Sequence, residues 1–151
     1  MPTRRKTLQH GAAAAGVLAT AALLPSQALA WNKAAFESKT VADAAKAFGG
    51  TSMTQSSAVT VTGPDIAENG AVVPLGAATT LTGVKHMLIM VEKNPNALVA
   101  MFNVSDAVEP NFATRAKMGQ TSDVYAVAIT ADGKAHFAKK EVKVTLGGCG
   151  G

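Results

Sequence analysis

The sequence predicts a mainly β protein built as an antiparallel β-sandwich, with an N-terminal helix and a flexible C-terminal arm. Three observations lead to this fold class. From Ser57 onward, short runs of apolar and polar residues alternate between Gly, Pro and Asn, which is typical of many short strands joined by turns. Residues 36–48 show helical spacing instead. The last five residues, 147–151, place the single cysteine of the chain among four glycines.

The N-terminus has the pattern of an export signal peptide. Residues 4–6 are basic, an Ala-rich apolar run follows over residues 11–24, and residues 28–30 supply a small-x-small cleavage site. Residues 3–9 resemble a twin-arginine signal, with Thr7 where an aromatic residue is usual. A Sec-type signal with an incidental arginine pair is the alternative. Either route predicts export to the periplasm.

Removal of the signal changes the charge of the chain. Cleavage after Ala30 takes 30 of the 151 residues and leaves 121, which is enough for one domain with a real core. Three of the 14 Lys and Arg residues leave with the signal, so 11 basic residues face 10 acidic ones and the net charge is +1. This balance predicts binding to neither nucleic acid nor an anionic membrane. The apolar run is short and broken by Pro25, which argues against a membrane helix.

The mature chain begins with a helical segment, residues 31–50, in which residues 36–48 are expected to form the one clear helix. Thr40 and Asp43 have the spacing of a capping box, whose side chains satisfy free backbone N–H groups. Four apolar side chains then share one face: Val41, Ala44, Ala45 and Phe48. Two glycines follow and provide the left-handed stop. So narrow an apolar stripe requires packing on the domain or on a partner.

The sandwich domain is expected over residues 51–146. The expected strands are residues 58–61, 71–75, 79–81, 86–91, 98–104, 115–118 and 124–129, followed by a last one within 134–146. The strand 86–91 is apolar on both faces, which predicts a central position. Asp132-Gly133 is a strong hairpin signal. Seven or so short strands with frequent turns are typical of an immunoglobulin-like sandwich. The Cys…Trp…Cys pattern of antibody domains is absent, so the prediction concerns architecture alone.

The last strand leads directly into the C-terminal arm. Val142, Val144 and Leu146 alternate with polar residues, as in a half-buried strand. The glycines of the arm lack a Cβ and have little preferred shape, so the arm is predicted to be flexible: Gly147, Gly148, Gly150 and Gly151. Three residues beyond Leu146 reach about 10 Å when extended, which is enough to enter a cleft in another protein.

Cys149 is the single cysteine, so it cannot form an intrachain disulfide. An odd cysteine in an exported protein indicates intermolecular pairing or a working thiol. No basic residue lies within the arm to favour the thiolate, and the nearby terminal carboxylate opposes it. We therefore interpret Cys149 as an attachment point on which other enzymes act. A frayed tail with an incidental thiol is the alternative.

The rest of the chain shows no pattern of catalytic or metal-binding residues. His86 and His136 are isolated, whereas a metal site needs three or four converging ligands. Met87 and Met90 lie three apart on a strand and so point to opposite faces, which indicates packing rather than copper binding. We find no Ser-His-Asp arrangement, phosphate loop or pair of carboxylates. The sequence therefore predicts a non-enzymatic protein without a cofactor or a metal.

Three segments of the mature chain, residues 143–151, 64–74 and 117–124, resemble the SoxY family, the sulfur-carrier subunits of bacterial thiosulfate oxidation. The most specific segment is residues 143–151, with the sequence Lys-Val-Thr-Leu-Gly-Gly-Cys-Gly-Gly, and residues 64–74 and 117–124 support it. The resemblance extends over essentially the whole mature chain and the twin-arginine leader. It implies an immunoglobulin-like fold and a heterodimer with a SoxZ-like subunit.

The resemblance also implies a role for Cys149. A haem-containing enzyme would couple thiosulfate oxidatively to the thiol, a hydrolase would release sulfate, and a sulfane dehydrogenase, where present, would act on the sulfur that remains. The arm, residues 147–151, would swing between these partners. A disulfide dimer through Cys149 is a further expectation.

Two other functions fit part of the sequence. An exported β-sandwich that acts as a structural or interaction protein would use Cys149 merely to crosslink dimers. A diglycine end also occurs in ubiquitin-like sulfur carriers, which load sulfur as a terminal thiocarboxylate, here on Gly151. Those carriers need ATP-dependent adenylation in the cytoplasm, which conflicts with the export signal.

Overall fold

The computed structural model describes residues 32–145 of the 151-residue chain. This part is mostly β, as predicted, with two short helices ahead of nine strands. The helices are α2 (Lys33–Phe36) and α3 (Val41–Ala47). The strands are β1 (Met53–Gln55), β2 (Val59–Thr62), β3 (Ile66–Ala67), β4 (Val73–Thr79), β5 (Val84–Val91), β6 (Leu98–Asn103), β7 (Asn111–Ala116), β8 (Ser122–Thr130) and β9 (Ala135–Val144). Neither helix has the length and apolar composition that a membrane span requires.

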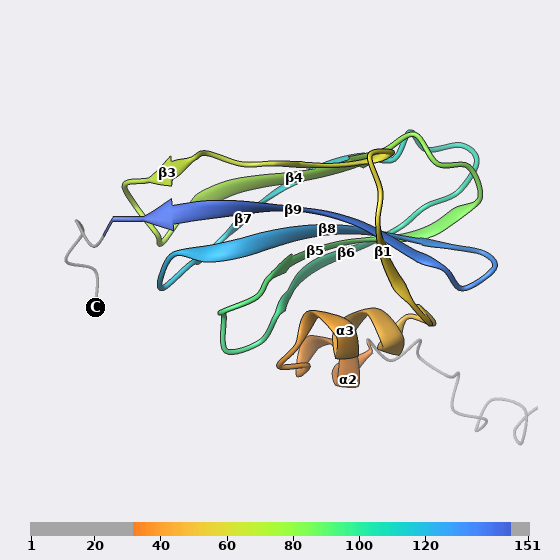
Figure 1. Cartoon of the computed structure of the whole chain (residues 1–151), viewed down its shortest axis with the longest axis horizontal. Coiled ribbons are helices and arrows are strands. Elements are labelled where there is room, and N and C mark those ends of the chain that lie inside the picture. The colour runs from red at the N-terminus through yellow and green to blue at the C-terminus, as the bar shows by residue number, and fades with distance from the viewer. Residues whose placement is uncertain (1–31, 146–151) are drawn as a thin grey trace, which may run out of the picture. The chain divides into compact units, whose positions relative to one another are not determined.

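The strands form two sheets that pack as a sandwich (Figure 1). The larger sheet has the order β1-β9-β8-β5-β6, with β3 also paired to β9, and the smaller has the order β2-β4-β7. Pairing among β5, β6, β8 and β9 and within the smaller sheet is antiparallel, as predicted. β1 and β3 pair with β9 in parallel. These two strands were not predicted, because three or two residues are too few for an alternating pattern.

Two hydrophobic clusters hold the layers together. One lies between the two sheets, and the other lies between the larger sheet and the helices, which sit together on one side of it (Figure 1). β5 contributes to both, because Met87 faces the first cluster while Leu88 and Met90 face the second. The predicted central strand and the predicted packing roles of Met87 and Met90 are thus confirmed.

The prediction of one helix over residues 36–48 is wrong, because α2 ends at Phe36 and α3 begins only at Val41. Between them, the Ser38 hydroxyl donates a hydrogen bond to the Ala34 carbonyl oxygen at 2.7 Å. The Ser38 carbonyl oxygen accepts one from the Ala97 N–H at 2.9 Å. The chain therefore bonds to the β5–β6 connection at this point instead of continuing the helix, and the serine side chain offers the local alternative.

Thr40 caps α3 as predicted. Its Oγ1 accepts a hydrogen bond from the Asp43 N–H at 3.1 Å. The Asp43 carboxylate differs from the expectation, since it accepts from the Thr40 hydroxyl at 2.7 Å rather than from a backbone N–H. At the other end, Gly49 has a φ of +85°, which is the left-handed conformation expected of the stop.

We expect Thr40→Ala to lower the free energy of unfolding by about 1 kcal/mol, because the first turn of α3 loses its acceptor. Urea denaturation followed by circular dichroism measures this loss. Thr40→Ser keeps the hydroxyl and serves as the matched control, with stability close to that of the wild type. Equal stability of the Ala and Ser variants would show that the cap contributes nothing.

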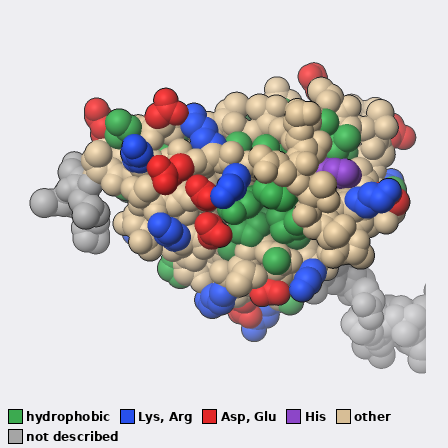
Figure 2. Space-filling model, in the orientation of Figure 1, with side chains coloured by type: hydrophobic (Ala, Val, Ile, Leu, Met, Phe, Trp, Pro, Cys, Tyr) green, Lys and Arg blue, Asp and Glu red, His purple; other side chains and the backbone are tan. Residues whose placement is uncertain are grey.

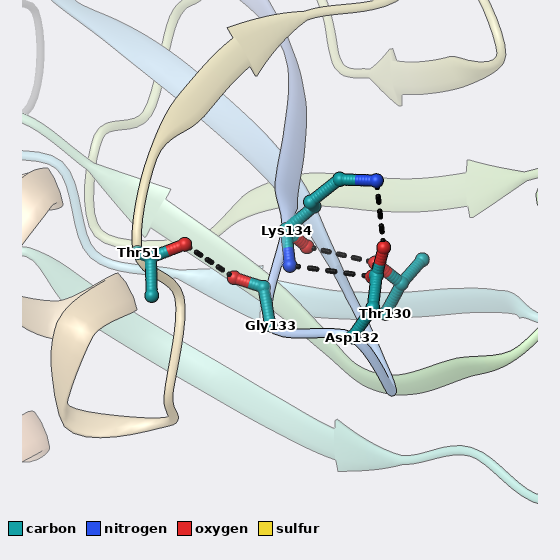
Figure 3. Close-up of polar contacts among 5 residues, drawn as sticks. All are labelled: Thr51, Thr130, Asp132, Gly133 and Lys134. Atoms are coloured by element: carbon teal, nitrogen blue, oxygen red, sulfur yellow. Dashed lines mark hydrogen bonds and ion pairs between the residues drawn. The ribbon is translucent and has the colours of Figure 1, made fainter.

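The hairpin between β8 and β9 has the predicted Asp-Gly turn (Figure 3). Gly133 has a φ of +81°, a conformation that glycine adopts readily. Two hydrogen bonds to the Asp132 carboxyl lower its pKa. The bond from the Lys134 side chain has the larger effect, and the bond from the Thr130 hydroxyl has the smaller one. The backbone N–H and the hydroxyl of Thr51 donate to the Gly133 carbonyl oxygen at 2.9 and 3.0 Å. The turn is thereby tied to the segment that leads into β1.

Two predicted strands have different boundaries. The separate strand over residues 79–81 is wrong, because β4 runs unbroken from Val73 to Thr79. A Cβ on Gly76 would collide with Thr62 Oγ1 and lie 3.3 Å from the Phe112 carbonyl oxygen. This glycine therefore allows close packing inside the sheet and does not mark a turn. The strand expected at 115–118 lies earlier, at Asn111–Ala116.

Candidate functional site at the root of the C-terminal arm

The predicted attachment residue and its arm lie outside the described residues, and so does the predicted signal peptide. The arm residues concerned are Gly147, Gly148, Cys149, Gly150 and Gly151. The structure does describe the chain that leads to them, as far as Thr145. We call the arm root the last two residues of β9 with Thr145 (residues 143–145), together with the two segments that hold them, residues 63–72 and 117–121. The roles of the arm residues stay predictions.

β3 holds one edge of β9 at the arm root. Lys143 pairs with Ile66, and Val144 pairs with Ala67. The Lys143 N–H donates to the Asp65 carbonyl oxygen at 3.0 Å, and the Thr145 N–H donates to the Ala67 carbonyl oxygen at 3.1 Å. The last strand is therefore bonded up to the final described residue.

Thr121 holds the opposite edge of the same strand. Its Oγ1 accepts a hydrogen bond from the Val144 N–H at 3.0 Å. Successive N–H groups of a strand point in opposite directions, so Lys143 and Thr145 reach β3 while Val144 reaches Thr121. The side chain of Val144 packs against the cluster between the sheets, and Val142 is fully buried in it, as the alternation predicted. Because this end of β9 is hydrogen-bonded on both edges and packed on one face, the arm root is held firmly in the domain.

Gly70 packs directly against the end of β9. Its carbonyl oxygen accepts a hydrogen bond from the Met118 N–H at 2.7 Å. A Cβ at this position would collide with the Met118 carbonyl oxygen and lie 2.8 Å from Val144 Cγ1. Only glycine fits here without displacement of the backbone. No local pattern in the sequence distinguishes Gly70 from the other glycines that lie between strands.

The three segments that carry the family resemblance meet at the arm root. Residues 64–74 bond to β9 through Asp65 and Ala67, and to residues 117–124 through Gly70. Residues 117–124 in turn bond to β9 through Thr121. Segments separated by as many as 78 positions thus surround the point where the arm leaves the domain.

One ion pair fixes the segment ahead of β3. Lys140 Nζ lies 2.8 Å from Asp65 Oδ1 and donates to the Gly63 carbonyl oxygen at 2.7 Å. The hydrogen bond from Lys140, with the charges of Lys140 and Lys143, lowers the pKa of the Asp65 carboxyl. The Asp65 side chain is 89% exposed, so water screens the pair and its contribution to stability is small. Its effect is to orient residues 63–65 along β9.

The two histidines of the described part lie in unrelated surroundings. His86 Nδ1 lies 3.0 Å from Asn103 Oδ1, and its ring packs 5.5 Å from that of Phe48. His136 lines a shallow, open depression beside the β8–β9 hairpin. Within residues 32–145, no three His, Cys, Asp or Glu side chains are grouped so that they could hold a metal ion.

Comparisons with known proteins agree with the resemblance. Residues 44–149 match the family described as "Sulfur oxidation protein SoxY". Among solved structures, the chain is similar to the sulfur carrier protein SoxY from Chlorobium limicola f thiosulfatophilum, with 35% identity, 68% of this chain and 92% of that chain covered, and a TM-score of 0.61. No match was found among curated proteins.

A superoxide reductase (neelaredoxin) from Ignicoccus hospitalis is also similar in structure. It has 13% identity and a TM-score of 0.51, with 58% of this chain and 80% of that chain covered. So low an identity shows a common fold and nothing about activity.

Proposed function

Because the chain belongs to the SoxY family of sulfur oxidation proteins and is a sulfur carrier of the Sox system, we propose that Cys149 is its covalent attachment point. On this proposal, Cys149 holds thiosulfonate and sulfane adducts in the periplasm while partner enzymes act on them. The observation that carries the proposal is the extent of the family match. It runs to residue 149, which is the only cysteine of the chain.

On this proposal, the attachment of thiosulfate uses one reacting group of this chain, the Cys149 thiol. The thiol and thiosulfate join through a new S–S bond, which releases one proton and two electrons and gives a cysteine S-thiosulfonate. The haem-containing partner takes up the two electrons. Water then cleaves the terminal S–S bond with the help of a hydrolase, so that sulfate leaves and a persulfide stays on Cys149. The persulfide is the substrate of a sulfane dehydrogenase where one is present.

The arm root supports this role. β9 is bonded on both edges up to Thr145, and Cys149 follows four residues later in the sequence. The arm root is held in the folded domain, and the extension beyond it is short and rich in glycine. The domain can therefore stay folded while the thiol enters the active-site clefts of different enzymes. Ordering the glycines at each visit opposes tight binding, which favours rapid transfer from one enzyme to the next. The twin-arginine-type signal would bring the chain to these partners, together with a SoxZ-like subunit.

Intact mass spectrometry of the protein isolated from thiosulfate-oxidising cells tests the proposal. We expect a mature chain that begins at Trp31 and carries thiosulfonate or persulfide adducts, which peptide mapping places on Cys149. A disulfide dimer as the sole modified form would instead support the crosslinking protein. Sulfur on the carboxyl group of Gly151 would support a thiocarboxylate carrier.

A further inference from the structure

One edge of the larger sheet is open. β1 and β3 both pair with β9, whereas β6 is the last strand on the other side and pairs with β5 alone. Within residues 32–145, no hydrogen bond from outside the β5–β6 pair reaches the backbone of residues 99–103. An open edge presents N–H and C=O groups to which a strand of another chain can bond.

The register of β5 and β6 identifies the groups on this edge. The Val104 N–H donates to the Lys85 carbonyl oxygen at 2.9 Å, and hydrogen-bonded pairs recur at every second residue of an antiparallel ladder. From residue 100 onward, the even-numbered residues of β6 therefore bond to β5, whereas the N–H and C=O groups of Met101 and Asn103 point away from it. The irregularity in this register lies nearer the start of β6, so these two residues belong to a regular strand.

The sequence of β6 lacks the usual protection of an edge strand. Natural edge strands are often very short, charged or interrupted by proline. β6 has six residues, and none of them is charged or a proline. β9, which lies toward the other edge, has four charged residues within 139–143. Figure 2 shows basic and acidic side chains together on the face where Figure 1 places β9. An open edge without charge is typical of a strand that pairs with another chain.

Apolar side chains lie beside the open edge. The rings of Phe102 in β6 and Phe112 in β7 stack with their centroids 4.4 Å apart and 5° between their planes. Both rings are half-buried, and so are Val99 and Met101. A strand bonded to β6 would have side chains next to these and would cover part of their surface. Hydrophobic burial would then add to the backbone hydrogen bonds.

We propose that β6 is the interface of a homodimer, in which β6 of a second copy of this chain pairs with it in antiparallel orientation about a two-fold axis at Met101. Such a pair is self-complementary, since the same strand supplies both sides. It joins the larger sheets of the two copies into one continuous sheet. The homodimer does not use Cys149, so this inference does not rest on the function proposed above.

The exposed charges beyond the two ends of β6 favour a second copy as the partner. Ahead of the strand lie Lys93 and Lys39, whose Nζ is 2.7 Å from Asn96 Oδ1, and after the strand lie Asp106 and Glu109. The ends of β5 offset one charge on each side, through an acid at position 92 and a lysine at position 85. The start of β6 thus keeps an excess of positive charge and its end an excess of negative charge. In an antiparallel pair the start of each strand lies beside the end of the other, so the opposite charges approach each other.

The homodimer leaves the arm roots outside the interface. β9, β8, β5 and β6 are antiparallel in turn, so the end of β9 lies at the same end of the sheet as the start of β6. An antiparallel pair of β6 strands therefore places the two arm roots at opposite ends of the joined sheet. This homodimer is thus different from the disulfide dimer through Cys149 that the sequence predicts.

Analytical ultracentrifugation of the full-length mature chain in a reducing buffer tests the homodimer. We expect a monomer–dimer equilibrium for the wild type and the same equilibrium for Cys149→Ser. Asn103→Lys places a charge on the open edge, and Asn103→Pro removes an N–H that points toward the second copy. Each should raise the Kd of the dimer about tenfold or more, because a symmetric dimer contains the change twice. Thr54→Lys is the matched control, since Thr54 is exposed in β1 at the opposite edge of the sheet, and its Kd should stay within about twofold of the wild type.

Amide hydrogen exchange in the wild type gives a second measurement that needs no variant. The Met101 N–H should exchange more slowly as the protein concentration rises, because it gains an acceptor in the dimer. Circular dichroism shows whether each variant keeps its fold. A wild type that stays monomeric would overturn the homodimer, even where a different subunit binds to β6. So would a dimer that persists in both Asn103 variants, or one that Thr54→Lys weakens equally.

Discussion

Replacing Cys149 with serine is expected to abolish sulfur loading, with at least a hundredfold loss of thiosulfate-dependent electron transfer, on the order of removing an essential reacting group. A hydroxyl cannot form the S–S bond that holds the cargo, and the chain has no second cysteine to replace it. The fold should persist, because both hydrophobic clusters are built from residues ahead of the arm. Reduction of an electron acceptor by the coupling enzyme measures the loss, and intact mass shows whether an adduct forms.

Gly151→Ser is the matched control for this experiment, because it alters the same arm but keeps the thiol. We expect it to load sulfur. The opposite result, with Cys149→Ser active and Gly151→Ser inactive, would contradict a cysteine carrier and indicate chemistry at the terminal carboxyl group.

Gly70→Ala should have the largest effect on stability, with a loss of about 3 kcal/mol in the free energy of unfolding. The new Cβ would collide with the Met118 carbonyl oxygen and press on Val144 Cγ1, so the backbone at the arm root must move. Gly119→Ala is the matched control. Its Cβ meets nothing within 4 Å, and a change within about 0.5 kcal/mol is expected there.

Denaturant unfolding compares the two variants. Similar stabilities would show that the arm root relaxes around a methyl group and that Gly70 is not required.

Local pattern sufficed for β5 and for the hairpin of β8 and β9, but not for β4 or β7. Alternation around Val142 and Val144, the doubly apolar run at residues 86–91 and the Asp132-Gly133 turn all depend on neighbouring residues, and the structure agrees with each. The helix over residues 36–48 failed for the opposite reason. Its interruption at Ser38 is stabilised by Ala97, a residue 59 positions away that no local pattern connects to it.

By itself, the sequence determined that the protein is mainly β and that its only thiol stands in a glycine-rich C-terminal arm behind a last strand. These features are local, since they depend on alternation, on glycine and on the number of cysteines. Only the tertiary structure decided what surrounds that strand: β3 lies on one edge, Thr121 on the other, and Gly70 against Val144. The physical reason is that backbone hydrogen bonds and close packing select partners by position in the folded sheet, and residues far apart in the chain carry no mark of that position in their own sequence.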